Sequence, residues 1–245
     1  MFRLTAAFLL TALPAFAFDV TDMTDEERAA FQSEVRDYLV SNPEVMLEVI
    51  AALEAREAEM EAANDANMIA ANAAAIYNDG HSWIGGNPEG DVTIVEFLDY
   101  RCGFCRRAHP VIDALVENDP NIRLVVKEFP ILGEESVMAS RFALAVKAVH
   151  GDDAYKRVHD ALMELRAGVN DRTLAGIAEA EGLDADALFA AMDGAEITEV
   201  INANRALAQA MAINGTPSFI VGDQLLRGFL PLEGMQAVVA DARDG

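Results

Sequence analysis

Cys102 and Cys105 are the only two cysteines in this chain of 245 residues, and their sulfurs are its most nucleophilic side-chain atoms. Two residues, Gly103 and Phe104, separate them, and the apolar run VTIVEFL, which is typical of a buried β-strand, precedes them. A pair so placed can be a structural disulfide, part of a metal site, or a redox couple. The elements around it decide among these uses.

The position of Cys102 favours redox chemistry. It lies just after a predicted strand and at the start of a predicted helix that runs to about Glu117. A helix N-terminus offers unpaired N–H groups and partial positive charge, which stabilise a thiolate. We therefore expect an exposed Cys102 at the helix tip to react with other disulfides, and Cys105, one turn inside, to resolve the mixed disulfide. Three arginines add local positive charge: Arg101, Arg106 and Arg107.

The other uses of the pair explain less. A disulfide between residues three apart closes too small a loop to remove much chain entropy. A structural zinc site needs four ligands, and His109, on the same helix, leaves the set incomplete. We therefore expect no resident metal and no cofactor. A Cu(I) site made by the two thiolates remains the alternative from another functional class, because soft ligands select Cu(I).

The N-terminus predicts export. Arg3 precedes an apolar stretch from Leu4 to Leu13, and Ala15-Phe16-Ala17 fits a cleavage site, so residues 1–17 read as a signal peptide. About ten apolar residues are too few for a membrane anchor, which needs roughly 20. We expect a periplasmic protein that does not insert into the membrane.

The composition excludes two classes of partner. The net charge is −23, whereas nucleic acids and anionic lipid surfaces are bound by basic patches. At 52% hydrophobic residues, the chain can build a substantial core, which fits one large domain with an appendage.

Residues 18–77 form the predicted appendage, which is helical. Thr24 and Glu27 have the spacing of a capping box, and a second helix begins near Pro43. Part of this helix has the spacing of a coiled-coil seam: Met46, Ile50, Leu53 and Met60. One interpretation is a solvated appendage on its own domain; the other is an oligomerisation region within residues 24–76 that makes a homo-oligomer.

A linker is expected at residues 78–90, which are rich in Gly, Asn, Asp and Pro. The remaining residues, 91–245, predict an α/β domain of the order β-α-β, helical block, β-β-α, in which a right-handed crossover makes the first two strands parallel. The predicted strands are 92–98, 122–129, 218–221 and 225–228, the helical block is 134–212, and a last helix begins at Pro231.

Several stretches together resemble the thioredoxin superfamily and, within it, the DsbA-like branch. The features are Cys102-Gly-Phe-Cys105 at a helix start, a helical block, and Gly215-Thr216-Pro217 before a late strand. The stretches NPEVMLEVI, EFLDYRCGFC and KEFPILG are similar to ScsC and Com1-type proteins, over residues 30–245. The resemblance implies a thioredoxin fold with a central mixed sheet and an all-helical insertion.

The resemblance also implies roles for individual residues. Cys102 becomes the nucleophile and Cys105 the resolving thiol. Pro217 becomes a cis-proline facing them, and the backbone of Thr216 offers hydrogen bonds to a substrate peptide, beside Gly103 and Phe104.

Two charged residues complete the implied site. Glu96, six residues before Cys102, is where the branch places a buried acid, which can accept the proton of Cys105. Lys127 is its expected charge partner, although both can also be an ordinary strand-end pair. His109 is interpreted as a helix-surface residue.

The predicted function is an exported protein thiol-disulfide oxidoreductase. Gly103-Phe104 replaces the Pro-His of strongly oxidising members, which favours a milder oxidant, and an oligomer would favour isomerase or reductase activity. A monomeric dithiol oxidase is the alternative. The expected partners are reduced or disulfide-containing secreted proteins and a membrane redox protein that recycles the pair.

Overall fold

The computed structural model describes residues 23–244. The predicted signal peptide, residues 1–17, lies outside the described residues. The chain divides into two compact units, and the division falls between Glu57 and Ala58. Each unit is described by itself.

Helix α1, Asp25–Ser41, begins at the predicted capping box. The backbone N–H of Glu27 donates to Oγ1 of Thr24 at 3.3 Å, and the backbone N–H of Thr24 donates to Oε2 of Glu27 at 2.9 Å. These reciprocal bonds satisfy two N–H groups at the start of the helix, so the predicted start of the helix is confirmed.

Helix α2, Glu44–Ala71, and the short α3, Ala73–Tyr77, follow. The apolar residues of the predicted seam on α2, and three on α1, are 40–64% exposed: Phe31, Val35, Tyr38, Met46, Ile50, Leu53 and Met60. Towards its end α2 changes character, because Asp65 and Ile69 are buried.

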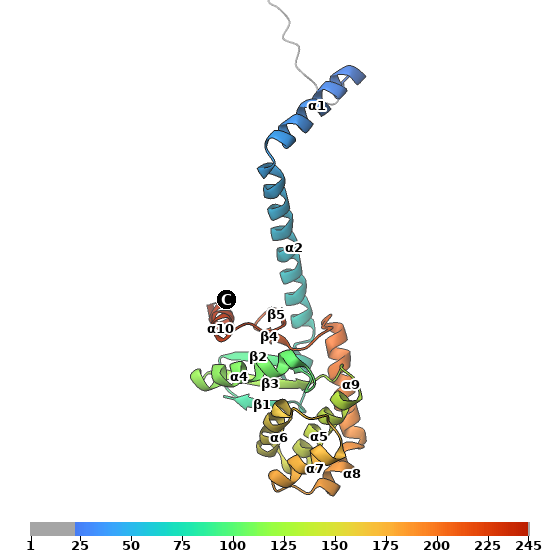
Figure 1. Ribbon diagram of the computed structural model, residues 1–245. Helices are drawn as coiled ribbons and strands as arrows, with labels where there is room; N and C mark the ends of the chain where they lie inside the picture. Colours follow the sequence, from blue (N-terminus) through green and yellow to red (C-terminus); the bar gives the residue numbers. More distant parts are fainter. Residues whose placement is uncertain (1–22, 245) are drawn as a thin grey trace, which may run out of the picture. The chain divides into compact units, whose positions relative to one another are not determined.

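A mixed five-stranded sheet forms the centre of the second unit, with the order β1-β3-β2-β4-β5 (Figure 1). Strands β2 and β3 are parallel, as the crossover rule predicted, and the other neighbours are antiparallel. The strands are β1 Trp83–Gly86, β2 Val92–Leu98, β3 Ile122–Glu128, β4 Ser218–Val221 and β5 Gln224–Arg227.

Strand β1 corrects the prediction of a linker at residues 78–90. It pairs with β3 from Trp83↔Val126 to Gly86↔Arg123. The indole of Trp83 stacks on Tyr155 with 5.7 Å between ring centroids, and it folds across Gly85, where a Cβ would come within 2.1 Å of the ring. Gly85, one of the glycines that suggested a linker, therefore makes room for an aromatic side chain on an edge strand.

Helices cover both faces of the sheet (Figure 1). Helix α4, Gly103–Asn118, and helix α10, Leu232–Asp244, pack in one core with alternate residues of the central strands, such as Ile94 and Leu98. Helices α3 and α9 pack in a second core with the intervening residues, such as Val95 and Phe97. Successive strand residues point to opposite faces, so the face of each strand residue follows from its parity.

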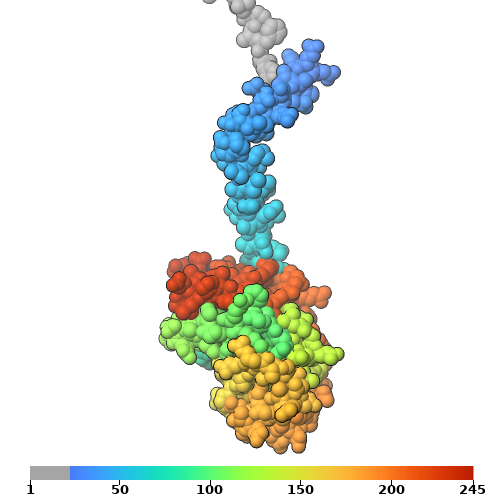
Figure 2. Space-filling model, in the orientation of Figure 1, coloured from blue at the N-terminus to red at the C-terminus, as the bar shows by residue number. Residues whose placement is uncertain are grey.

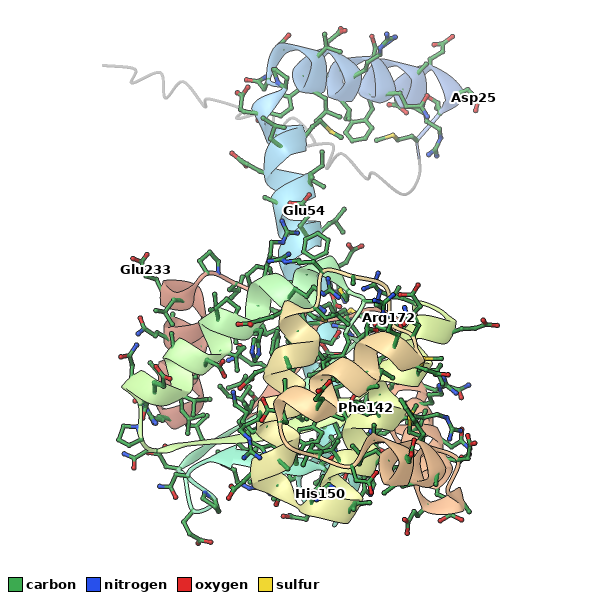
Figure 3. The ribbon with its side chains drawn as sticks, turned by 60° about the horizontal axis from the view of Figure 1, so that its bottom comes forward. Asp25, Glu54, Phe142, His150, Arg172 and Glu233 are labelled. Atoms are coloured by element: carbon green, nitrogen blue, oxygen red, sulfur yellow. The ribbon has the colours of Figure 1, made fainter. Side chains whose placement is uncertain are left out.

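The all-helical insertion between β3 and β4 consists of five helices, in agreement with the predicted block. They are α5 Glu134–His150, α6 Asp152–Glu164, α7 Asp171–Ala180, α8 Ala185–Met192 and α9 Ala195–Ala210. Phe142 is fully buried among them, whereas Arg172 lies on the surface of α7 (Figure 3). Between residues 23 and 244, no helix has both the length and the apolar character needed to cross a bilayer.

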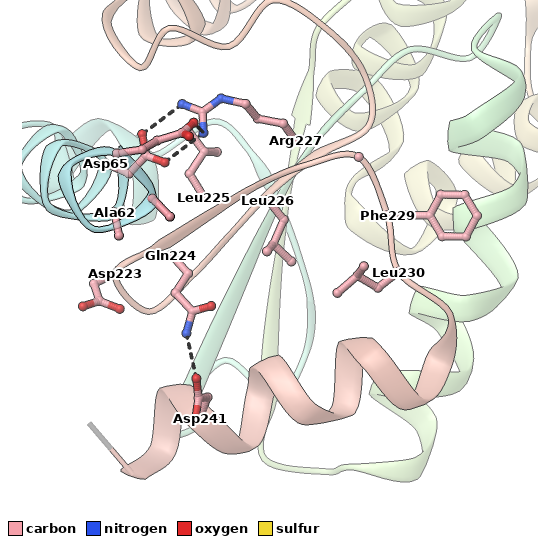
Figure 4. Close-up of a pocket in the computed structure, with 13 residues that line it drawn as sticks. Ala62, Asp65, Asp223, Gln224, Leu225, Leu226, Arg227, Phe229, Leu230 and Asp241 are labelled. Atoms are coloured by element: carbon pink, nitrogen blue, oxygen red, sulfur yellow. Dashed lines mark hydrogen bonds and ion pairs between the residues drawn. The ribbon is translucent and has the colours of Figure 1, made fainter. Parts of the chain in front are cut away.

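A pocket of about 730 Å³ lies between the end of α2 and strand β5, within the second unit (Figure 4). Its wall includes a bidentate ion pair, in which the guanidinium of Arg227 donates to the two carboxylate oxygens of Asp65 at 2.8 and 2.9 Å. Asp65 is buried, so this planar pair fixes the last turns of α2 to the sheet edge.

A second ion pair fastens the segment before β1. Lys127 on β3 is fully buried, and its Nζ donates to Oδ2 of Asp79 at 2.5 Å and to the carbonyl of Ala75 at 2.7 Å. Burial disfavours the ionised form of Asp79, but hydrogen bonds from His81, Lys127 and Ser82 outweigh it and hold the pKa of Asp79 well below 3.8. Asp79 therefore stays ionised at neutral pH; burial lowers the pKa of Lys127, and the ion pair with Asp79 opposes that shift.

Replacing Asp79 by Asn leaves the buried ammonium of Lys127 without its counter-ion, so we expect the free energy of unfolding to fall by about 3–5 kcal/mol in urea titrations. Adding Lys127→Met should recover part of this loss.

Because pairing lowers the folded-state pKa of Asp79, its contribution to stability should be complete above its ordinary pKa and disappear as pH falls through the lowered value. Equal acid sensitivity of the Asp79→Asn variant and the parent would contradict this role.

Candidate active site

The two cysteines lie where the sequence predicted, at the start of α4. Cys102 is the N-cap residue, and its Sγ accepts the backbone N–H of Cys105 at 3.5 Å. Both carry free thiols. The expectation of an exposed Cys102 is wrong for this conformation, because the residue is 6% exposed and Cys105 is fully buried. Cys102 is covered because the segment at Thr216 lies against it.

The environments of the two sulfurs separate their pKa values. A hydrogen bond from the thiol of Cys105 is the main cause that lowers the pKa of Cys102, to about 5, despite partial burial. Thr216 and the backbone N–H groups of Cys105 and Phe104 add to this effect. Burial, the hydrogen bond to Cys102 and the charge of Glu96 raise the pKa of Cys105 far above its usual value. Cys102 is therefore a thiolate at neutral pH, and Cys105 is a thiol.

The segment before β4 faces the pair. The Thr216–Pro217 peptide bond is cis, as the resemblance implied, and the carbonyl of Thr216 lies 3.1 Å from Sγ of Cys102. On the other side, Gly103 has open space where a Cβ would project, and Phe104 is 57% exposed. The residues expected to contact a substrate peptide thus surround the sulfur of Cys102.

Arg107 contributes to this surface by stacking on Phe104. Its guanidinium carbon lies 4.2 Å from the centroid of the Phe104 ring. The contact holds an exposed aromatic ring under a positive charge beside the reactive sulfur.

Asp99, which the sequence analysis did not select, anchors the loop that carries Cys102. Its fully buried carboxylate accepts the backbone N–H groups of Arg101 at 2.8 Å, Ile131 at 2.8 Å and Leu132 at 3.0 Å. It thereby joins the loop after β2 to the loop after β3. An aspartate just after a buried strand is a signal for such a loop anchor.

Glu96 lies beneath the pair as predicted. It is 3% exposed, and its Oε1 has no hydrogen-bond partner in the described part of the chain. Burial raises its pKa to about 8; the positive charge of His109 acts against this, and the nearby carboxylates and the Cys102 thiolate act with it. An uncompensated carboxyl group near Cys105 can exchange a proton at neutral pH.

The expected ion pair between Glu96 and Lys127 is wrong. Glu96 lies opposite Val126 in the parallel register, so its side chain and that of Lys127 point to opposite faces of the sheet. Lys127 pairs with Asp79 in the second core instead. It is a structural residue and does not belong to the site.

The neighbouring residue, Glu128, points to the same face as Glu96, and sequence reasoning missed it. Its carboxylate accepts hydrogen bonds from the hydroxyls of Tyr155 at 2.6 Å, Tyr100 at 2.7 Å and Ser140 at 2.7 Å. Burial raises its pKa to about 7, and the three hydroxyls oppose that shift. Lys127 and Glu128 are successive residues of an otherwise apolar strand, so their side chains point to opposite faces of the sheet and enter different cores.

His109 is not the surface residue that the sequence suggested. Its side chain is 14% exposed, and its Nε2 lies 3.0 Å from Oδ1 of Asp160 and 3.4 Å from Oδ2 of Asp113. Asp160 belongs to α6, so the insertion covers a position that looks exposed on an isolated α4.

Two family models match the chain. Residues 93–240 match the DSBA-like thioredoxin domain, and residues 27–59 match the copper resistance protein ScsC N-terminal domain. The first match covers strands β2 to β5, the cysteine pair and the helical insertion, and it begins after β1. The second covers α1 and the beginning of α2.

Solved structures give the same result. A thioredoxin-like oxidoreductase from Silicibacter pomeroyi is 44% identical, with a TM-score of 0.66, over 70% of this chain and 98% of that one. The thiol-disulfide exchange protein alpha-DsbA2 of Wolbachia pipientis is 27% identical, with a TM-score of 0.69, over 74% of this chain and 97% of that one.

A curated relative is much longer than this chain. The Na(+)/H(+) antiporter NhaA 1 of Salinispora arenicola is 30% identical over 164 residues, which are 65% of this chain and 24% of the antiporter. The chain thus spans about a quarter of the length of this relative. With a thioredoxin fold, a helical insertion, a capped cysteine pair and a family match over most of its length, the chain belongs to the DSBA-like thioredoxin domain family.

Proposed function

We propose that this protein is an exported thiol-disulfide oxidoreductase that acts on cysteines of other proteins. The observation that carries the proposal is the placement of Cys102 at the N-cap of α4 beside the buried Cys105 thiol, whose hydrogen bond is the main cause that lowers the pKa of Cys102 to about 5. The similarity to the thiol-disulfide exchange protein alpha-DsbA2 supports the same chemistry.

The reductive direction begins with the Cys102 thiolate. It attacks one sulfur of a substrate disulfide, the substrate S–S bond breaks, and the other substrate sulfur leaves as a thiolate. The mixed disulfide is then held between Phe104 and the backbone of Thr216, where an extended peptide can form hydrogen bonds. Attack by a substrate thiolate on an oxidised Cys102–Cys105 pair is the reverse sequence.

Resolution needs the proton of Cys105 to leave. The carboxylate of Glu96 accepts this proton, and the Cys105 thiolate attacks Sγ of Cys102. The second substrate sulfur leaves as a thiolate, so the substrate gains two electrons and the Cys102–Cys105 disulfide forms. In isomerisation, a substrate thiolate attacks the mixed disulfide first and regenerates the Cys102 thiolate.

The exposed seam on α2, together with the exposed apolar residues of α1, supports a homo-oligomer formed within residues 24–76. Apolar side chains at heptad spacing are left in solvent, which costs free energy unless a second copy covers them. Several active sites in one assembly would favour isomerisation or reduction over oxidation by a monomer. The match to the ScsC N-terminal domain covers residues 27–59, which lie in the same segment.

Periplasmic location and recycling by a membrane redox protein complete the proposal. They rest on the predicted signal peptide at residues 1–17 and on the need of any thiol-disulfide catalyst for an external electron donor or acceptor. Reduced or disulfide-containing exported proteins are the proposed substrates.

Removing the Cys105 thiol should raise the pKa of Cys102, because that thiol is the main hydrogen-bond donor to the thiolate. We expect Cys105→Ala to shift the pH dependence of Cys102 alkylation by iodoacetamide upward from about 5. Thr216→Val should cause a smaller shift, since Thr216 makes a smaller contribution. An unchanged alkylation profile in Cys105→Ala would refute this account of the reactive thiolate.

Replacing Glu96 by Gln should slow the resolution of a mixed disulfide, since the proton acceptor of Cys105 is lost. We expect a decrease of about a hundredfold in the release of a bound peptide from Cys102 in a single turnover. In the parent, the rate should rise as pH increases through about 8, the pKa of Glu96, and this rise should be absent in Glu96→Gln. The exposed Glu117→Gln is the matched control, with parental rate and profile.

Replacing apolar seam residues by glutamate should abolish assembly without abolishing the oxidation of dithiols. We expect the Ile50→Glu/Leu53→Glu chain to sediment as a monomer, to lose reshuffling of scrambled ribonuclease and to retain dithiol oxidation. The control is Ala52→Glu/Ala55→Glu, on exposed positions outside the seam, which should sediment like the parent. A monomeric parent would contradict the oligomer, and tight Cu(I) binding without any turnover would support the copper-binding alternative.

A further inference from the structure

A second group of coordinating side chains lies away from the cysteines, between α4 and α6. His109 on α4 and His159 and Asp160 on α6 each offer one donor atom, and these atoms all lie within 4.8 Å of one another. The two helices are in contact, and the green surface that includes α4 borders the yellow and gold surface of the insertion in Figure 2. The charge of His109 acts on the pKa of Glu96, but none of the three residues takes part in the thiol exchange itself.

The orientation of His159 is fixed by a buried chain of hydrogen bonds. The hydroxyl of Tyr100 donates to Oε1 of Glu128 at 2.7 Å, so its oxygen accepts the Nδ1 proton of His159 at 3.0 Å. The imidazole therefore keeps a lone pair on Nε2. Metal-binding histidines usually have this arrangement, in which the other ring nitrogen donates to a fixed acceptor.

The other possible metal ligands, from His109, Asp160 and Asp113, lie on the side of His159 that is nearer to solvent. Nε2 of His109 lies 3.0 Å from Oδ1 of Asp160, and the rings of His109 and His159 lie 5.0 Å apart, edge to face. Asp113, one turn further along α4, brings a second carboxylate to 3.4 Å from His109. Asp160 and Asp113 are about one third exposed, so an ion can enter and keep a water ligand.

Lys156 competes for the same carboxylates. Its Nζ lies 2.7 and 2.8 Å from the two oxygens of Asp160 and 3.3 Å from Asp113. A bound cation would have to share Asp160 with this ammonium group. The competition gives the group a signature that an adventitious surface site lacks, because removing Lys156 should improve binding.

We propose that His109, His159 and Asp160 form a binding site for Zn²⁺, which joins the thioredoxin core at α4 to the helical insertion at α6. Two imidazoles, one carboxylate and a position for water or Asp113 match the ligand types and number of open zinc sites. None of the three ligands belongs to the cysteine pair or to the residues proposed to exchange disulfides.

The test uses the full chain with Cys102→Ser and Cys105→Ser, so that thiolates cannot bind the metal. Titration calorimetry with zinc chloride should give one ion per chain, and the melting temperature should rise with zinc concentration. His109→Asn and Asp160→Asn, made in this background, should weaken binding about tenfold or more. The matched controls are His150→Asn and Asp153→Asn, which replace exposed residues and should bind zinc like the parent.

Lys156→Gln gives the opposite prediction and does not remove a ligand. Zinc should bind about threefold more tightly, because an exposed competing ion pair is lost. The melting temperature without zinc reports whether each variant folds. Absence of binding in the cysteine-free chain, equal binding after His109→Asn and Asp160→Asn, or weaker binding after Lys156→Gln would each overturn the proposal.

Discussion

The hydrogen bonds at the N-terminus of α4 are the constraint on which the site depends. Helix caps are usually oxygen acceptors, but here the sulfur of Cys102 takes that place. An anionic sulfur satisfies the free N–H groups better than a neutral one, so the helix favours the thiolate. Asp99 fixes the loop in front of the cap, and Thr216 lies against the sulfur from the other side. The reactivity of Cys102 therefore follows from backbone geometry and a neighbouring thiol.

Two buried acids lie on the same face of the sheet, and their partners give them different roles. Glu128 accepts three hydroxyl hydrogen bonds, which hold it in place and tie β3 to the helical insertion. Glu96 has an oxygen without a hydrogen-bond partner in the described chain, and a carboxyl group of this kind in an apolar environment can take part in proton transfer. The contrast supports proton transfer through Glu96 and a structural role for Glu128.

The predictions from sequence succeeded where the information is local. The strand before Cys102, the start of the helix at the cysteine pair, the capping box at Thr24 and the extent of the helical block all follow from local sequence patterns. The errors concern relations between elements. Pairing Glu96 with Lys127 required the register of two strands, and the surroundings of His109 depend on α6, fifty residues later. Trp83 in a glycine-rich segment concealed an edge strand, because only the fold provides Tyr155 to stack on it.

The end of α2 has a consequence for how such proteins can be recombined. Ile69 and Ile76 belong to the core around α9, and Asp65 binds Arg227, so these residues serve the catalytic unit although they continue the N-terminal helices. The boundary between units falls inside α2, with no loop to mark it. A gene fusion that joins a new N-terminal module near Asn78 removes part of the core, whereas a junction at Ala58 keeps it whole. Exchange of the N-terminal segment therefore requires helix-to-helix splicing in matching phase.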